Sequence, residues 1–387
     1  MFELTIARRH VSSDIKMVLF TVLSVALAIG VIVVLTGVNE GSRNSLIASL
    51  VEHNPHITIS PKENEDYITL YRTLSKMVSN YPQVEAVSPR LLGKAGAKYK
   101  DKVRAVGLIG ANPIQEDLLL NIQKDMVWGN YSELIYAKHA AVLGVNLADD
   151  LKLRPGGQFI LIRQNKSIKL MVAGLIKTGT GSDETLVYLP LATAQEILGE
   201  PDIVSEVGLR LSDIYAAPSI AADINRKTNY NAESWQQLNK DALQVLDTQN
   251  LTLYLFYSLI MIISGFGVAN SMIVNVTRRT KEIGILLAMG TTKRSILKIF
   301  IIQSLILGPP AALLGCALAY IVAMTINSYP IQISIGDLFL VSRLEVLLTY
   351  QDYLLAVIFA LAVNILSGIY PAYRASQLDP VEAIGSV

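Results

Sequence analysis

Few residues of this chain combine the types and spacing that catalysis or metal binding requires. His53 and His56 flank Asn54-Pro55, so the two imidazoles lie in a turn rather than on one helix face. No Asp, Glu or Cys nearby completes a ligand set at a usual spacing. The one cysteine, Cys316, excludes an internal disulfide and any multi-cysteine metal site. We therefore expect no metal centre.

Nucleotide-binding and hydrolase motifs are also missing. A phosphate-binding loop needs G-x-x-x-x-G-K-[ST], and the nearest match, Gly174 to Gly179, is not followed by the required lysine. The chain has four histidines and many serines, but it has no G-x-S-x-G nucleophile elbow. These absences predict a chain that is not an enzyme and that binds no cofactor itself.

The most organised polar stretch is basic and apolar rather than catalytic. Residues 277–298 read TRRTKEIGILLAMGTTKRSILK. Ile283, Leu286 and Leu287 recur at helical spacing, and Gly290 is placed to end the helix. A glycine inside such a helix costs about 1 kcal/mol relative to alanine, so Gly284 suggests close approach by another backbone. The charged residues at its start are Arg278, Arg279, Lys281 and Glu282.

This pattern predicts a short helix with an exposed apolar stripe and a basic rim. Two interpretations of the stripe remain open on physical grounds. An exposed apolar stripe can be the docking site of a partner protein. A basic amphipathic helix can equally rest on lipid headgroups.

The elements that position this helix are long apolar runs. About 20 mostly apolar residues are needed to span a membrane. Hydrophobic residues make up 51% of the chain and charged residues only 17%, which is low for a soluble protein. We predict a membrane protein, α-helical with four transmembrane helices. The predicted spans are 17–37, 251–276, 299–326 and 353–370. The first is too long for a signal peptide and lacks an A-x-A site, so it is interpreted as an uncleaved anchor.

Basic residues in short loops set the orientation of these spans. Arg8, Arg9 and Lys16 precede the first span, six basic residues lie in 277–298, and Arg374 follows the fourth span, whereas Arg343 is the one basic residue of the loop 327–352. We therefore expect both termini in the cytoplasm of a cell whose inner or plasma membrane holds the protein. The net charge of +1 gives no electrostatic case for nucleic acid as a partner.

Both ends of the chain carry short helix patterns. The first 16 residues form an apolar stripe opposite basic residues, which predicts a cytoplasmic amphipathic helix. In the tail, Asp379, Pro380 and Glu382 stand in the order of an N-cap, a first-turn proline and a third-position acid. We expect a short helix there, against the inner face of the membrane.

Residues 38–250 have ordinary soluble composition and enough length for one compact domain outside the cytoplasm. Strand-like and helical runs are interleaved in it, so an α+β domain inserted between spans 1 and 2 fits best. Apolar residues keep helical spacing on both flanks, within 46–51 and 235–246. These flanks predict a stalk that continues the first two spans; alternatively, they are domain helices that abut the membrane.

Polar and small residues within the predicted spans indicate helix contacts. Ala311, Gly315 and Ala319 are small residues at four-residue spacing, which would allow close helix packing. No acid or base lies inside a span, which argues against an ion-coupled transporter. Four amides are expected to face other helices or the membrane interface: Asn270, Asn275, Gln303 and Asn364.

Longer segments carry a family resemblance. NVTRRTKEIGILLAMGTTKRSILKIFIIQSLILG resembles the region between the second and third spans of ABC permeases of the MacB/FtsX superfamily, nearest to the lipoprotein-releasing LolC/LolE permeases. GVNEGSRNSLIASLVEHNPHITI resembles that family's exit from the first span, and AVLGVNLADDLKLRPGGQFILI its outer-domain core. LLTYQDYLLAVIFALAVNILSGIYPAYRASQLDPVEAI resembles its last span and tail. Together these segments cover nearly the whole chain.

The resemblance implies an outer domain of the MacB periplasmic-core type and a unit of two permeases, identical or paired with a paralogue. Two cytosolic ABC ATPase subunits, which bind ATP and Mg, would complete it. Residues 277–298 would contain the coupling helix that docks on the ATPase and drives extraction or export of a hydrophobic client such as a lipoprotein. The matching positions are Arg278, Arg279, Lys281, Glu282, Ile283, Gly284, Leu287 and Gly290.

A candidate client surface lies on the outer halves of the first two spans, where membrane lipid is the neighbour. It is chosen for its position and apolarity, and because LolE-like permeases hold acyl chains there. Its residues are Leu35, Val38, Leu255, Leu259 and Ile262. Two other functions remain open: an FtsX-like signalling permease that controls an extracellular hydrolase, and a membrane-anchored receptor without an ATPase.

Overall fold

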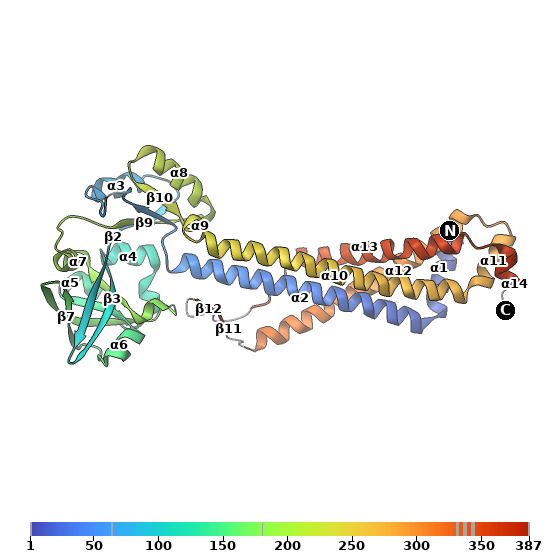
Figure 1. Ribbon diagram of the computed structural model, residues 1–387, viewed down its shortest axis with the longest axis horizontal. Coiled ribbons are helices and arrows are strands. Elements are labelled where there is room, and N and C mark those ends of the chain that lie inside the picture. The colour runs from blue at the N-terminus through green and yellow to red at the C-terminus, as the bar shows by residue number, and fades with distance from the viewer. Residues whose placement is uncertain are drawn as a thin grey trace. The chain divides into compact units, whose positions relative to one another are not determined.

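The structure is a computed structural model that describes residues 2–62, 65–179, 181–329 and 345–385, together with the backbone of two short strands near residue 337 (Figure 1). Arg343 lies outside the described residues. The chain divides into two compact units. The helical unit comprises residues 1–44, 245–332 and 342–387, and the sheet unit comprises 45–244 and 333–341.

The helical unit is built from long apolar helices. Among the described residues, four helices are long and apolar enough to cross a membrane by length and composition, and each contains one predicted span. They are α2 (Ile15–Glu52), α10 (Lys240–Arg278), α12 (Lys293–Ser328) and α13 (Tyr350–Ser376). Three shorter helices accompany them: α1 (Phe2–Ser13), α11 (Thr280–Ala288) and α14 (Pro380–Gly385). Figure 1 shows both termini at the end of this unit where α11 and α14 lie.

Small residues on α12 allow the long helices to pack closely, as the sequence predicted. Ala311 and Ala319 are fully buried. A Cβ added to Gly315 would lie 2.7 Å from the carbonyl oxygen of Ala26 on α2, which leaves no room for a side chain. The helix continues through Pro309 and Pro310 without interruption.

The amides predicted within the spans divide into two groups. Asn275, Gln303 and Asn364 are buried among the helices, whereas Asn270 is exposed. Hydroxyl groups also meet inside the unit, since the Thr21 and Ser271 oxygens lie 2.6 Å apart. The Asn364 amide donates to the Ala360 carbonyl, whereas neither polar atom of the buried Gln303 side chain has a hydrogen-bond partner among the described residues.

The sheet unit contains a mixed ten-stranded sheet in the order β10-β1-β9-β2-β3-β8-β5-β7-β4, and β6 pairs with β2 and β7. As predicted, its helices and strands are interleaved along the chain. The strands are β1 (Ile57–Ser60), β2 (Val84–Tyr99), β3 (Lys102–Ala111), β4 (Met126–Gly129), β5 (Ala140–Gly144), β6 (Gln158–Arg163), β7 (Lys166–Ile176), β8 (Leu186–Pro190), β9 (Glu206–Leu211) and β10 (Asn231–Ser234). Separate strands β11 (Ile333–Ile335) and β12 (Phe339–Val341) pair with each other.

Helices and single 3₁₀ turns cover this sheet and divide the unit into two lobes. Lobe A consists of β1, β9, β10, α3 (Tyr71–Val78), η3 (Ile214–Ala216), α8 (Ala217–Lys227) and α9 (Trp235–Leu238). Lobe B consists of β3 to β8, α4 (Pro113–Leu120), η1 (Ile122–Asp125), α5 (Glu133–Tyr136), α6 (Val145–Leu151), η2 (Gly181–Glu184) and α7 (Leu191–Leu198). Strand β2 belongs to both, because Val87 packs in the core of lobe A and Leu91 in that of lobe B.

The flanking segments of the sheet unit are helical, as the periodicity predicted. The long helices α2 and α10 extend to Glu52 and back to Lys240. Ile47 and Leu50 from α2 are buried in the core of lobe A, and Ala242 from α10 packs against it. The end of α2 thus supplies core residues to lobe A, and the stalk stays a prediction.

A buried ionic network lies where β2 passes from lobe A to lobe B. The Arg90 guanidinium lies 3.0 Å from Glu116 and 2.8 Å from Glu206, and Ser88 donates to Glu116 at 2.6 Å. Burial opposes the charge of Arg90, but the two carboxylates outweigh it and raise the pKa of the guanidinium. A buried pair left without one partner is strongly destabilising, so this network stabilises the packing of β2 against α4 and β9.

Candidate functional site

The predicted coupling segment folds as a short helix between two long ones. Helix α10 continues to Arg278, so Arg278 belongs to α10 and Arg279 is the residue that precedes α11. Gly290 has φ +92°, and it ends α11 as predicted. Its N–H donates to Leu287 at 3.0 Å, while Thr291 donates to Leu286 at 3.1 Å. This is the paired hydrogen-bond pattern of a glycine C-terminal cap.

The apolar stripe of α11 is not exposed, and that prediction was wrong. Ile283 is only 2% exposed, and Leu286 and Leu287 are half-buried against the helical core. Helix α14 packs on α11, and a Cβ added to Gly284 would lie 2.7 Å from the Ala383 Cβ. The close neighbour that Gly284 suggested is therefore the C-terminal helix of the same chain.

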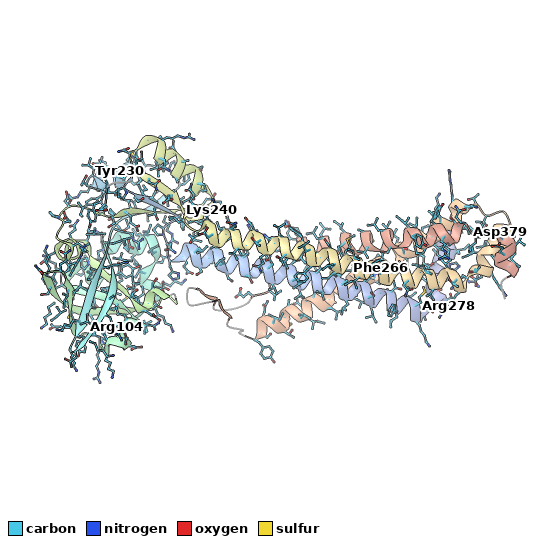
Figure 2. The ribbon with its side chains drawn as sticks, viewed as in Figure 1. Arg104, Tyr230, Lys240, Phe266, Arg278 and Asp379 are labelled. Atoms are coloured by element: carbon cyan, nitrogen blue, oxygen red, sulfur yellow. The ribbon has the colours of Figure 1, made fainter. Side chains whose placement is uncertain are left out.

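Helix α14 forms as its capping pattern predicted. Asp379 accepts a hydrogen bond from the Val381 N–H at 2.8 Å, and its carbonyl accepts from Ala383 at 2.9 Å. Figure 2 labels Asp379 beside α14, and Arg278 at the end of α10. Since the apolar face of α11 is already covered by α14, a partner protein meets other side chains.

The charged residues around α11 hold the amino-terminal helix in place. Arg278 pairs with Asp14 at 3.0 Å. Arg279 pairs with Glu282 at 3.0 Å and donates to the Ser13 hydroxyl. Three of the eight predicted coupling residues thus contact the α1–α2 junction or each other. Among the described residues, no ion pair is found for Lys281, which is exposed.

His10 on α1 is buried in this cluster. It is 7% exposed, its Nε2 lies 3.8 Å from Glu282, and its ring faces Phe300 at 6.2 Å between centroids. Burial, helped by the charge of Arg279, lowers the pKa of His10 to about 4. The imidazole is therefore neutral at pH 7, which suits an apolar contact surface between α1 and α12.

The exposed side of α11 carries apolar residues that the sequence analysis did not select. Ile285 is 50% exposed and Met289 is 77% exposed, and they lie four residues apart on one face. Val381 on α14 is also strongly exposed. The i, i+4 spacing of Ile285 and Met289 could have indicated this exposed face. The stripe of Ile283, Leu286 and Leu287 has the same helical period, so the period alone did not separate the two.

The predicted client residues differ in exposure. Leu255, Leu259 and Ile262 on α10 are 68%, 55% and 54% exposed, whereas Leu35 and Val38 on α2 are half-buried. Hydrogen bonds tie these two helices together, from Asn39 to Asn250 at 2.9 Å and between Thr36 and Tyr257 at 2.8 Å. The structure thus brings the five residues onto two neighbouring helices, and α10 supplies the open apolar face.

The two histidines that flank Asn54-Pro55 have separate partners. His53 lies 3.2 Å from Asp125, and His56 accepts a hydrogen bond from the Leu211 N–H at 2.9 Å. Burial lowers the pKa of His56, with a further contribution from Arg210. In the described part of the chain, no three His, Cys, Asp or Glu residues gather as a metal site.

Comparisons with known families match both units. Residues 18–227 match the MacB-like periplasmic core domain, and residues 254–380 match the FtsX-like permease C-terminal family. The first match alone covers more than half of the chain. The chain belongs to the MacB/FtsX superfamily of ABC transporter permeases. Its resemblance to this superfamily, inferred from sequence segments, is thereby confirmed.

Known members of the superfamily resemble this permease over nearly its whole length. The lipoprotein-releasing system transmembrane protein LolC of Neisseria meningitidis is 22% identical over 94% of this chain and 92% of its own. LolE of Haemophilus influenzae is 24% identical over 95% and 94% of the two chains. The macrolide export ATP-binding/permease protein MacB of Psychrobacter arcticus is 24% identical, but this chain spans only 56% of it.

Family membership gives the geometry around α11 a context. ABC transporter permeases are membrane proteins that work with ATPase partners. The outer domain of the MacB periplasmic-core type corresponds to the sheet unit, and the apolar helices to the helical unit. The large apolar side chains exposed on α11 and α14 are Ile285, Met289, Val381 and Ile384 among the described residues.

Proposed function

We propose that this chain is the permease subunit of an ATP-driven transporter and that it is not itself an enzyme. It would couple ATP hydrolysis by a separate ATPase, which binds ATP and Mg, to movement of the outer domain. The close match to LolC and LolE over more than nine-tenths of their length supports this proposal. MacB, an ATP-binding/permease protein, is matched over only about half of its length.

The proposed topology has four membrane spans, formed by α2, α10, α12 and α13. The sheet unit would lie outside the cytoplasm between the first two spans, and both termini would be cytoplasmic. Basic residues near α11 and at both ends of the chain support this orientation. The length and apolarity of the four helices support the number of spans.

The ATPase would dock on the exposed surface of α11 and α14. We define this docking surface as Lys281, Ile285, Met289 and Val381. The single observation that carries the proposal is the arrangement of α11: one face is anchored in the bundle through Ile283, and the other presents apolar side chains. A helix anchored in this way transmits a displacement to the long helices, because it cannot move independently of them.

The remaining predicted coupling residues would act indirectly. Arg278, Arg279 and Glu282 would position α11 against the amino-terminal helix, and Gly284 would seat α14. Leu287 would anchor the helix in the core, and Gly290 would end it. These roles make the residues necessary for coupling without requiring that each touches the ATPase.

A second permease copy or a paralogue would cover part of α10. Only 11% of the most apolar window of α10 is buried within this chain, against 44% in α2. A large apolar surface of this kind is covered by lipid, by a partner helix or by a client.

Leu255, Leu259 and Ile262 are proposed to meet the client at this surface, with Leu35 and Val38 behind them.

The client is proposed to be hydrophobic, and a lipoprotein is the first candidate. The names of LolC and LolE state lipoprotein release for those relatives, while MacB is named for macrolide export. Both kinds of client have apolar parts that fit the open face of α10.

The experiment that tests this function is co-purification in mild detergent. The chain would be expressed together with an ABC ATPase from the same organism, and bound protein and lipid would be identified by mass spectrometry. We expect the ATPase to co-purify, and Ile285→Asp with Met289→Asp to abolish its binding. Thr277→Asp, an exposed change near α11 but outside the docking surface, is the matched control. Retention of the ATPase by the double variant would contradict the proposed docking surface, and absence of any ATPase with the parent would contradict the function.

A further inference from the structure

The end of α2 contacts both lobes of the sheet unit, and it does so by two different means. Its last apolar residues, Ile47 and Leu50, are buried in the core of lobe A. Its last residue, Glu52, pairs with Lys124 of lobe B at 2.6 Å. The next residue, His53, lies 3.2 Å from Asp125 of lobe B. The helix is thus packed into one lobe and tied by charge to the other.

The Glu52–Lys124 ion pair and the His53–Asp125 contact have matched register. Consecutive residues 52 and 53 meet consecutive residues 124 and 125, with acid opposite base in the first pair and base opposite acid in the second. A shift by one residue would place like charges together, which is unfavourable. The pairing therefore favours one position of α2 against lobe B.

The lobe B side of these contacts is firmly attached to its own lobe. Lys124 and Asp125 belong to η1, and Ile122 of the same turn is 2% exposed in the core of lobe B. The carbonyl of Asp125 accepts a hydrogen bond from Lys177, directly after β7, at 3.0 Å. A displacement of η1 would therefore move β7 and the strands paired with it.

The start of α10 forms no ion pair with lobe B among the described residues. Ala242 and Leu243 pack against lobe A. Within the described ranges, Lys240 and Asp241 at the beginning of α10 form no ion pair. Of the two long helices that reach the sheet unit, α2 is therefore the one that contacts lobe B through charged side chains.

A cavity lies next to these contacts. It has a volume of about 120 Å³, and its lining includes His53, Asn54, Ile122 and Asp125. Arg90, whose network joins β2 to α4 and β9, also lines it.

We propose that Glu52 and His53 form a joint with Lys124 and Asp125 through which movement of α2 repositions lobe B against lobe A. The α2 helix is unbroken from Ile15 to Glu52, so a displacement within the membrane reaches this joint. This inference rests on the proposed function, because ATP-driven movement of α2 is the input. These four residues are positioning residues, and they are not expected to touch the client.

The test is a charge-reversal cycle in the complete permease–ATPase complex in lipid nanodiscs. Spin labels would report the distance between the lobes, from Ala222→Cys on α8 and Asp149→Cys on α6, in a Cys316→Ser background. Distances are measured without nucleotide and with ATP and vanadate. Glu52→Lys and Lys124→Glu are made singly and together. Asp150→Lys is the matched control, because it reverses another exposed ion pair of lobe B, that with Arg104.

We expect the parent and the Asp150→Lys control to change their label distance with nucleotide, each single reversal to lose the change, and the double reversal to regain it. Exposed ion pairs contribute little to folding stability, so the single variants should unfold at the parent temperature. A normal distance change in the single variants, or no rescue in the double variant, overturns the joint. No distance change in a parent that binds its ATPase also overturns it, but leaves the proposed function standing. A parent that binds no ATPase overturns both.

Discussion

Gly284 and Ala383 lie so close that neither position tolerates a larger side chain. A Cβ on Gly284 would be 2.7 Å from the Ala383 Cβ, and Ala383 is itself 2% exposed. This contact joins α11 to the C-terminal helix, although the two residues are far apart in sequence. The proposed docking surface depends on it, because α14 carries Val381, one of the residues of that surface.

The first prediction follows from this contact. Gly284→Leu should displace α14 from α11, because the Ala383 methyl group and backbone leave no space. We expect loss of ATPase stimulation with little change in the unfolding temperature of the sheet unit. Limited proteolysis of the tail, read by mass spectrometry, measures the displacement. Ala288→Leu is the control, since Ala288 is exposed on the same helix and lies outside the docking surface. Normal coupling together with a protected tail in Gly284→Leu would refute the role of the contact.

The second prediction concerns Glu282. Its carboxylate pairs with Arg279 at 3.0 Å and lies 3.8 Å from His10. Glu282→Lys places a cation beside Arg279, so α11 and α1 should separate locally. Because Glu282 is 61% exposed, the pair is worth at most about 1 kcal/mol to folding. We expect a folded permease that binds its ATPase without stimulating it. Glu282→Gln, which removes charge without repulsion, should retain more stimulation. Equal ATPase stimulation in Glu282→Lys and the parent would count against a positioning role.

Local patterns predicted the local structure well. The helical period of Ile283 and Leu287 and the glycine at position 290 were enough to find α11 and its end. Asp379 was enough to find the start of α14. Caps and periods act over a few residues, so a single sequence records them directly.

Contacts between distant segments could not be predicted in the same way. Nothing near Ile283 indicates that α14, almost a hundred residues later, covers it. Likewise, the pairing of Arg278 with Asp14 is decided by how the long helices pack. An apolar stripe that another helix of the same chain covers has the same helical period as a stripe that a partner protein covers. The period alone therefore does not distinguish the exposed face with Ile285 and Met289 from the buried face with Ile283.

The third prediction is a pH dependence of α1 docking. The pKa of His10 is about 4 in the folded chain, against 6.5 as its ordinary value, because burial and then Arg279 disfavour the charge. The undocked form therefore binds more protons between these values, and docking weakens as the pH falls from about 6.5 towards 4. The full difference corresponds to at most about 3 kcal/mol, since one pKa unit is 1.36 kcal/mol.

Hydrogen exchange of residues 2–13 at pH 7 and pH 5 measures this effect. Protection should fall at pH 5 in the parent, after correction for the intrinsic exchange rate. His10→Phe cannot be protonated and keeps a ring against Phe300, so its protection should be the same at both pH values. A parent and a His10→Phe variant with identical pH profiles would contradict the assignment to His10.

The last prediction addresses the client surface on α10. Leu259 and Ile262 are 55% and 54% exposed within this chain, so a carboxylate there leaves the internal packing intact. Leu259→Glu with Ile262→Glu should abolish release of a lipid-modified client while ATPase binding continues, because a charge disfavours an apolar chain at that site. Leu313→Glu on α12 is the matched control, since Leu313 is 73% exposed in another apolar helix. Both changes carry the cost of a charge in a membrane span, so a defect shared by Leu313→Glu would indicate poor insertion. Client release at the parent rate in the α10 double variant would show that the client binds elsewhere.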